Sequence, residues 1–216
     1  MHVRHLLGAA ETFGVSESAL RVALTRMTSA GDLERADGVH RLSARLLERQ
    51  RRQDEAINAR TVPWSGDWEQ AIIVATGRSA AERAQLRTDL TRLRLAELRE
   101  GAWMRPANLE RAWPADLEPL LVRFTSRPST GDEALVTSLW DLSIWSATGR
   151  ALLTQFTAST DPLARLTAAA AIVHHLTSDP VLPSELVPTD WPGDLLRTTY
   201  AAYQAELIEF AGSFRD

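Results

Sequence analysis

Residues 13–42, FGVSESALRVALTRMTSAGDLERADGVHRL, decide the fold of the first part of the chain. Gly14 suits a turn that other residues resist, and Ser16 is a good N-cap for a helix that Gly31 would end. The apolar residues of this helix recur at helical spacing and predict a buried face: Leu20, Ala23, Leu24 and Met27. The Asp-Gly pair at residues 37–38 then separates two short segments and is a strong hairpin signal. A turn, a helix and a hairpin in this order predict the reading half of a winged helix-turn-helix.

The outward face of this helix carries polar and basic side chains, which can read base edges in a major groove. The two serines at its start would hold the helix N-terminus on a phosphate. The predicted DNA-binding residues are Ser16, Ser18, Arg21, Thr25 and Arg26 of the helix, with Arg35 and Arg41 of the hairpin. The alternative is an ordinary surface helix and hairpin, but several signals agree in the right order and favour DNA binding.

The charge distribution is compatible with a site-specific regulator that binds DNA as a multimer. Residues 1–63 hold ten arginines against eight acidic residues, whereas residues 64–216 hold fourteen against twenty. The basic excess lies with the predicted reader, and the acidic remainder argues against a protein that coats DNA without specificity. The chain has no cysteine, which excludes disulfides and cysteine metal sites. It has no membrane-spanning apolar run and no signal-peptide pattern, so we expect a cytoplasmic protein with no membrane partner.

The chain divides into segments of different composition, and the class expected for the whole is α+β. We predict a winged helix-turn-helix at 1–43, a linker helix at 44–62, a ferredoxin-like middle domain at 63–130 and an all-helical C-terminal domain at 131–216. The linker helix carries four arginines that would contact phosphates or, as its dense charge favours, belong to a solvated face: Arg45, Arg49, Arg51 and Arg52.

The prediction for the middle domain depends on the order of its elements. The apolar run within Glu69–Thr76 predicts a buried strand, and Ser79 with Glu82 forms a capping box that opens a helix. Further strands are expected over residues 95–104 and 120–124, and another helix begins at Gly131 with apolar residues at helical spacing, namely Leu135, Leu139 and Leu142. This order predicts a ferredoxin-like module, and helical patterns follow it to the end of the chain.

The C-terminal loop at residues 179–193, DPVLPSELVPTDWPG, resembles a signature of the phenylacetic-acid-degradation repressor family, the PaaX-like regulators. The resemblance continues in matching order elsewhere. Phe13–Leu24 resembles the recognition helix of that family, Trp64–Trp68 its entry to the middle domain, and Leu139–Leu142 a Trp-Asp pair that follows it. The likeness therefore spans nearly the whole chain.

The resemblance implies a GntR-like winged helix, a ferredoxin-like middle domain similar to a CRISPR-adaptation protein, and a helical C-terminal domain. It also implies a homodimeric repressor on double-stranded operator DNA, released by phenylacetyl-CoA or another acyl-CoA effector. Two departures accompany it. A full winged helix-turn-helix has a scaffold helix before the one expected at residues 3–12, so the true start would lie upstream of Met1, or another element or subunit would cover that face. Residues 173–176 are Val-His-His-Leu where basic residues are expected, which would change the effector if they contact its phosphates.

No constellation for catalysis is visible in the sequence, so we expect no enzyme, no cofactor and no metal site. There is no Gly-x-Ser-x-Gly elbow and no glycine-rich phosphate loop. A metal-dependent nuclease would need a carboxylate where the first middle strand ends, but residues 74–76 are Val-Ala-Thr. The adjacent pair His174-His175 would point about 100° apart on a helix and makes a poor metal site.

The seven tryptophans would include one or two that line a pocket for an aromatic effector, although core packing explains most of them. Arginines would meet the phosphates of a CoA group. The candidate ligand-binding residues are Trp103, Arg105, Trp140, Trp145, His174 and Trp191. Two other functions stay open: a ligand-sensing or protein-interaction module with an incomplete DNA reader, and an enzyme acting on CoA esters.

Overall fold

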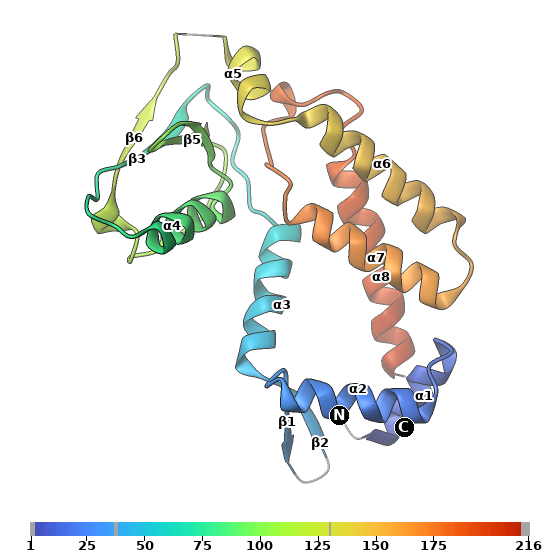
Figure 1. Cartoon of the computed structure of the whole chain (residues 1–216). Helices are drawn as coiled ribbons and strands as arrows, with labels where there is room; N and C mark the ends of the chain where they lie inside the picture. Colours follow the sequence, from blue (N-terminus) through green and yellow to red (C-terminus); the bar gives the residue numbers. More distant parts are fainter. Residues whose placement is uncertain (1–2, 37–38, 130, 213–216) are drawn as a thin grey trace. The chain divides into compact units, whose positions relative to one another are not determined.

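The computed structural model describes residues 3–36, 39–129 and 131–212 (Figure 1). The chain forms two compact units, each built from separate segments of the sequence. Unit 1 comprises residues 1–58, 149–177 and 194–216, and unit 2 comprises residues 59–148 and 178–193. The fold is mixed α/β, with the larger sheet in the middle of the sequence and helices towards its end.

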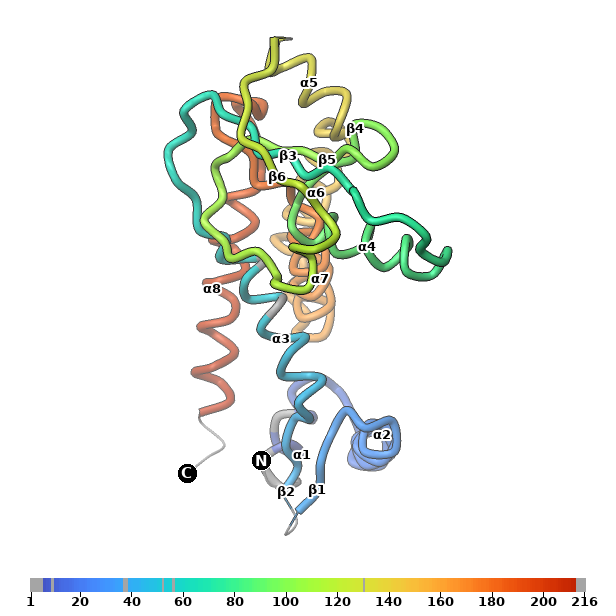
Figure 2. The backbone as a smooth tube through the Cα atoms, turned by 90° about the vertical axis from the view of Figure 1, so that its left-hand side faces the viewer, coloured from blue at the N-terminus to red at the C-terminus, as the bar shows by residue number. Residues whose placement is uncertain are grey.

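Unit 1 is helical apart from one two-stranded hairpin. Its elements are α1 (Val3–Thr12), α2 (Glu17–Ser29), β1 (Leu33–Ala36), β2 (Val39–Leu42), α3 (Ala44–Ile57), α7 (Pro162–Leu176) and α8 (Gly193–Gly212), with the later turns of α6 (Leu142–Ala158). The hairpin pairs antiparallel and follows α2 directly, as both views of the chain show (Figures 1 and 2). The predicted hairpin turn at residues 37–38 lies outside the described residues.

The boundaries of α2 confirm the local signals in the sequence. Gly14 lies in the turn before the helix with φ +67°, a left-handed value that glycine adopts without a steric penalty. Ser16 is the N-cap, and its hydroxyl accepts a hydrogen bond from Ala19 N at 3.3 Å. Gly31, with φ +72°, follows the last turn and lets Asp32 N donate to Met27 O at 2.8 Å. The helix therefore begins and ends where its capping residues predict.

The core of unit 1 includes the broad apolar face of α7. Its buried residues are Ala168, Ala169, Ile172, Val173 and Leu176. In α8, the Tyr203 ring contacts Phe156 of α6 edge to face, with ring centroids 5.3 Å apart. The Arg165 guanidinium of α7 lies over both rings, at 5.0 and 5.2 Å from their centroids. Aromatic and cation–π contacts thus join α6, α7 and α8 in unit 1.

Unit 2 is built on a four-stranded antiparallel sheet. Its elements are β3 (Trp68–Ile73), α4 (Ala80–Arg92), β4 (Ala96–Arg99), β5 (Ala102–Pro106), a 3₁₀ turn η1 (Glu118–Leu120), β6 (Leu121–Ser126), α5 (Asp132–Leu139), the start of α6, and a second 3₁₀ turn η2 (Ser184–Leu186). The strand order is β4-β5-β3-β6, so β3 is central and pairs with β5 and β6 in antiparallel register. The sheet therefore places β6, its last strand in the sequence, beside β3, its first.

The single strand expected over residues 95–104 is wrong, because the chain reverses within it. Two strands, β4 and β5, pair antiparallel across a short turn. Gly101 in that turn has φ +78°, which a side chain would disfavour. The register also shifts between Glu97 and Arg99, where the strand is irregular. The expected bend near Gly101 is therefore a full hairpin turn.

The two faces of this sheet are covered by different parts of unit 2 (Figure 2). Alternate residues along a strand point to opposite faces. One face packs against α4 in a cluster of buried residues: Ala71, Leu86, Leu90, Leu95, Trp103, Leu117 and Leu121. The other face contributes Trp68 and Met104, which pack with Val136 of α5 and Leu186 of the C-terminal loop. The signature loop is therefore part of the core of unit 2.

The helix expected from Gly131 through Leu142 ends earlier, at Leu139. Trp140 has extended backbone angles, φ −137° and ψ 137°, and packs with the cluster around Trp68. Asp141 Oδ1 then accepts a hydrogen bond from Ile144 N at 3.0 Å. That hydrogen bond lowers the pKa of the Asp141 carboxyl. The Trp-Asp pair of the sequence thus separates α5 from α6 and caps the second helix.

Replacement of Ser79 by alanine is expected to destabilise unit 2 by about 1 kcal/mol, because α4 loses its N-cap. Ser79 Oγ accepts from Glu82 N at 3.2 Å, and Glu82 Oε2 accepts from Ser79 N at 2.7 Å, which completes the predicted capping box. Urea unfolding followed by tryptophan fluorescence measures the change. Thr88→Ala in the same helix is the control, since Thr88 is exposed and alanine favours a helix; an equal loss in both variants would contradict the role of the cap.

Candidate nucleic-acid interface

The N-terminal end of α2 presents two exposed hydroxyl groups side by side. Ser16 Oγ and Ser18 Oγ lie 3.1 Å apart, and Ser16 Oγ also caps the helix. The first turn of a helix carries backbone N–H groups without helical partners and a partial positive charge, so it attracts phosphates. Ser16 and Ser18 are therefore placed where the sequence analysis predicted them, at the start of an exposed helix.

Arg21 is held on the outward face of α2 by Glu17, one turn earlier. Glu17 Oε1 accepts from Arg21 Nη2 at 2.6 Å and from Arg21 Nε at 2.8 Å, and both side chains are 60% exposed. The pair leaves Arg21 Nη1 without a partner among the described residues. Arg21 is thus restrained but open to solvent, and it still has donors to offer a base or a phosphate.

Thr25 and Arg26 continue the same exposed surface. Thr25 Oγ1 donates to Arg21 O at 3.0 Å, and the Thr25 side chain is exposed. The guanidinium of Arg26 makes no hydrogen bond or ion pair with any described residue. Val22, between these polar neighbours, is 58% exposed. The outward face of α2 therefore combines hydroxyl, guanidinium and apolar groups within two helical turns.

The hairpin does not bring its two arginines together. Its register places Arg35 opposite His40 and Glu34 opposite Arg41. Directly opposed residues share a face and successive residues alternate, so Arg35 and Arg41 project from opposite faces. Arg35 lies on the face of Leu33, which is buried at the base of the hairpin, whereas Arg41 is exposed on the other face. A surface that contacts one face of the hairpin would therefore meet only one of these two arginines.

Two of the four arginines of α3 pair with carboxylates. Arg45 pairs with Asp32 and so joins the start of α3 to the segment after α2. Arg51 pairs with Glu48 at 2.7 Å and approaches Glu55 at 4.0 Å, both on its own helix. Arg49 is exposed, and the side chain of Arg52 lies outside the described residues. These contacts fit the solvated face better than a row of phosphate contacts.

Arg105, a candidate ligand residue, is fully buried and has no donor left for a ligand. An arginine has five N–H donors, and here all five donate, at 2.7 to 3.3 Å, to the carbonyl oxygens of Arg94, Pro106, Pro180 and Val181 and to Asn108 Oδ1. Burial lowers the pKa of Arg105 to about 9, with nearby Arg111 acting in the same direction and Glu69 opposing it. Its role is to fix the C-terminal loop to the sheet.

The loop on which Arg105 acts has an unusual backbone. Val181 has φ +49°, a left-handed value that is unfavourable for a β-branched residue. Its N–H donates to Asp179 Oδ1 at 2.8 Å, and its carbonyl accepts from Asn108 Nδ2 at 3.1 Å as well as from Arg105. Asp179 is only 1% exposed. Asp179 and Asn108 are structural residues that sequence reasoning missed, because nothing local links them.

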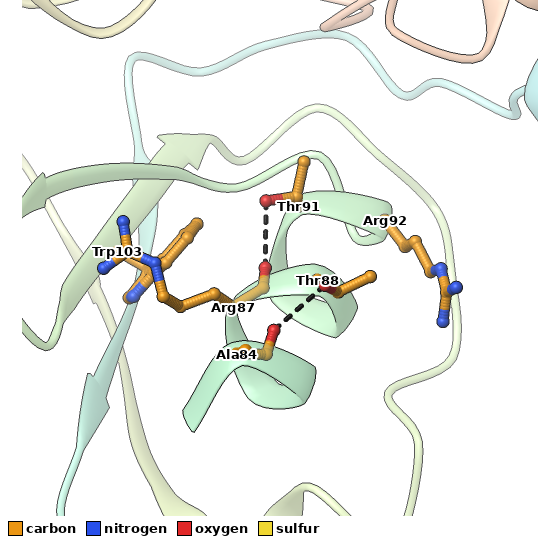
Figure 3. Close-up of a pocket in the computed structure, with 6 residues that line it drawn as sticks. All are labelled: Ala84, Arg87, Thr88, Thr91, Arg92 and Trp103. Atoms are coloured by element: carbon orange, nitrogen blue, oxygen red, sulfur yellow. Dashed lines mark hydrogen bonds between the residues drawn. The ribbon is translucent and has the colours of Figure 1, made fainter. Parts of the chain in front are cut away.

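An open pocket of about 450 Å³ lies beside α4 (Figure 3). Its lining residues are Ala84, Arg87, Thr88, Thr91, Arg92 and Trp103. The Arg87 guanidinium lies 5.7 Å from the centre of the Trp103 ring and pairs with Glu97 at 2.5 Å. Trp103 is itself 4% exposed, so its ring belongs mainly to the core. Trp103 is the one candidate ligand residue that lines this pocket.

Three family models match successive parts of the chain. The model described as PaaX-like protein matches residues 1–49, that of the PaaX protein central Cas2-like domain residues 61–128, and that of the PaaX-like protein C-terminal domain residues 143–216. The chain belongs to the PaaX-like family. These domains identify this PaaX-like protein, at the level of the family, as a transcriptional regulator of the PaaX type.

The chain is also similar to a solved structure. The PaaX-like chain is similar to the uncharacterized protein Rv0674 from Mycobacterium tuberculosis, with 43% sequence identity and a TM-score of 0.87. The similarity covers 100% of this chain and 92% of that one. No curated protein matches the chain. Among the described residues, none of the helices combines the length and apolar composition that a membrane span requires.

The remaining candidate ligand residues of this PaaX-like protein are dispersed. Trp145 stacks on Trp191 with ring centroids 4.3 Å apart, and Trp145 Nε1 donates to Ser178 Oγ at 3.2 Å. These contacts, like those of Trp140, hold the signature loop within unit 2. His174 is an exposed residue of α7 in unit 1. Within unit 2, Trp140, Trp145 and Trp191 thus stabilise the signature loop. Neither unit by itself contains all the candidate ligand-binding residues.

Proposed function

We propose that this PaaX-like protein regulates transcription by binding DNA through α2. In this proposal α1, α2 and the β1–β2 hairpin form a winged helix-turn-helix, with α2 as the recognition helix. The observation that carries the proposal is the exposed outward face of α2, where Arg21 is held by Glu17 and Arg26 has no partner among the described residues. Arg21 and Arg26 would contact bases or phosphates, and Ser16 and Ser18 would contact a phosphate.

The hairpin would act as the wing. Because Arg35 and Arg41 project from opposite faces, one of them would contact the DNA backbone while the other stays free. For the middle part we propose a ferredoxin-like module. Its strand order β4-β5-β3-β6 and the position of α4 between β3 and β4 in the sequence support this assignment. Between β5 and β6, η1 stands where a second helix would be expected.

We further propose that the protein is a homodimeric repressor with an acyl-CoA effector such as phenylacetyl-CoA. A dimer would place two copies of α2 on half-sites about 34 Å apart, or a multiple of that distance. The effector would release the operator only by binding more tightly to a state of the dimer with the wrong spacing. Arg105 is no longer a candidate for contact with the CoA phosphates, because its donors are all used within unit 2.

Fluorescence anisotropy with the intergenic DNA upstream of the protein's own gene tests this function. At fixed salt, we expect tight binding that phenylacetyl-CoA weakens, because the effector would shift the population of dimers. Tight binding that no acyl-CoA changes would keep the DNA-binding role and contradict the effector. Binding no tighter than to unrelated DNA would contradict the regulator and leave a ligand-sensing or interaction module.

A further inference from the structure

Among its described residues, α2 has one large apolar side chain that is exposed, that of Val22. Val22 is 58% exposed in the middle of α2, whereas Leu24 is buried and Leu20 and Met27 are half-buried. The small apolar residues Ala19 and Ala23 are exposed as well, so Ala23 does not lie on the buried face predicted for it. Valine also favours a helix less than alanine or arginine does. A polar or small residue would therefore suit this position better if it faced only water.

The surroundings of Val22 indicate what it meets when DNA is bound. On a helix, residues three and four positions apart are neighbours on one face. The neighbours of Val22 are accordingly Ser18, Ala19, Thr25 and Arg26, and Arg21 precedes it; all of them are exposed, and all but Ala19 are polar. An apolar group at the centre of a polar reading face would be left without a partner against phosphates or most base edges.

The major groove offers one apolar group on a base edge, the C5-methyl group of thymine. We propose that Val22 is a specificity-determining residue that contacts a thymine methyl group in each operator half-site. This inference rests on the proposed DNA-binding function and names part of the sequence that the protein recognises. Since Arg21 is the adjacent residue and guanine is the commonest base contact of arginine, the half-site would contain a guanine near that thymine.

Deoxyuridine offers a direct test, because it keeps the hydrogen-bonding groups of thymine and lacks only the methyl group. A footprint on the protein's own upstream DNA would first locate the half-sites. Duplexes covering the footprint would then carry deoxyuridine at one thymine at a time. We expect the wild-type protein to lose about fourfold in affinity at one thymine per half-site, the effect of removing one buried methyl group.

The variant Val22→Ala should bind thymine and deoxyuridine equally at that position, while it still responds to changes at the neighbouring guanine. Its fold should be preserved, since the side chain is exposed and alanine is a good helix former. Leu47→Ala is the matched control: Leu47 is 53% exposed on α3, outside the outward face of α2, and its loss should leave the thymine preference intact.

The possible outcomes distinguish a failure of the thymine contact of Val22 from a failure of the proposed DNA-binding function. Sequence-specific binding by the wild-type protein with no thymine sensitive to deoxyuridine would overturn the role of Val22 alone. The same follows if Val22→Ala keeps the full loss at the sensitive position, or if Leu47→Ala removes it. If the wild-type protein binds no DNA with sequence preference, the regulator and the contact of Val22 both fail.

Discussion

Arg21→Ala is expected to lower the affinity for operator DNA by about one to two orders of magnitude, towards the affinity for unrelated DNA. A good arginine–guanine pair contributes about 1–3 kcal/mol of discrimination. The fold should remain, because the ion pair with Glu17 is 60% exposed on both sides and such pairs contribute about 0.3–0.5 kcal/mol. Anisotropy with operator and unrelated DNA, alongside circular dichroism, measures both effects.

The control for Arg21 is another arginine in a similar setting. Arg51 is also exposed and paired with glutamates on its own helix, but it lies on α3. Arg51→Ala removes the same charge, and any electrostatic loss would be equal for operator and unrelated DNA, so the preference for the operator should not change. If the two variants lose the same ratio of operator to unrelated affinity, Arg21 is not a base-reading residue.

Arg105→Met is expected to destabilise unit 2 by several kcal/mol, so that it unfolds at a much lower urea concentration than the wild-type protein. The substitution removes a donor from all five acceptors, but Pro106 O still accepts from Asn108 N and Val181 O from Asn108 Nδ2. At most three acceptors, the carbonyl oxygens of Arg94 and Pro180 and Asn108 Oδ1, are left unpaired, and each unpaired buried group costs about 1–3 kcal/mol. The sum is a large part of the whole stability of a typical domain, about 5–15 kcal/mol. Lysine should not restore stability, because its three donors sit on one atom and cannot reproduce the planar fork of arginine.

Urea unfolding of the purified variants, followed by tryptophan fluorescence, tests the role of Arg105. The stacked pair Trp145 and Trp191 belongs to the loop that Arg105 holds, so its fluorescence should change at low denaturant in Arg105→Met. Arg99→Met is the control, since Arg99 is exposed on β4 of the same unit. A variant at Arg105 as stable as the control would show that another contact holds the loop.

The sequence predicted those parts of the fold that are specified within a few residues. Ser16 and Ser79 cap the helices they were expected to cap, because an N-cap bonds to the backbone three residues later. The single strand expected over 95–104 was wrong, since strand-like residues stand on both sides of Gly101 and the reversal is not evident until its left-handed backbone is known. Likewise, the apolar residues keep helical spacing past Trp140, so the sequence predicted a longer helix. In the structure, Trp140 packs on the cluster around Trp68 and α5 ends before it.

The candidate site likewise contains residues that the sequence could place and residues that it could not. The exposure of Ser18, Arg21 and Thr25 follows from helical periodicity, so the sequence could place them on one face. The opposite orientations of Arg35 and Arg41 depend on the register of the hairpin, which composition does not reveal. The role of Arg105 depends on carbonyl groups more than 70 positions away in the sequence, and no local pattern reports such a contact.

The attachment of residues 178–193 to the sheet limits how this protein can be divided or recombined. A gene fragment that ends after β6 would encode all four strands but lack the segment that supplies Leu186 to their core and the acceptors for Arg105. Exchange of C-terminal halves between relatives would likewise pair one protein's arginine with another protein's loop. Evolution would therefore preserve the sheet and the Asp-Pro loop together, although some 50 residues separate them in the sequence. The unit that is inherited together is therefore defined by the contacts between the sheet and the loop, and not by their being continuous in the sequence.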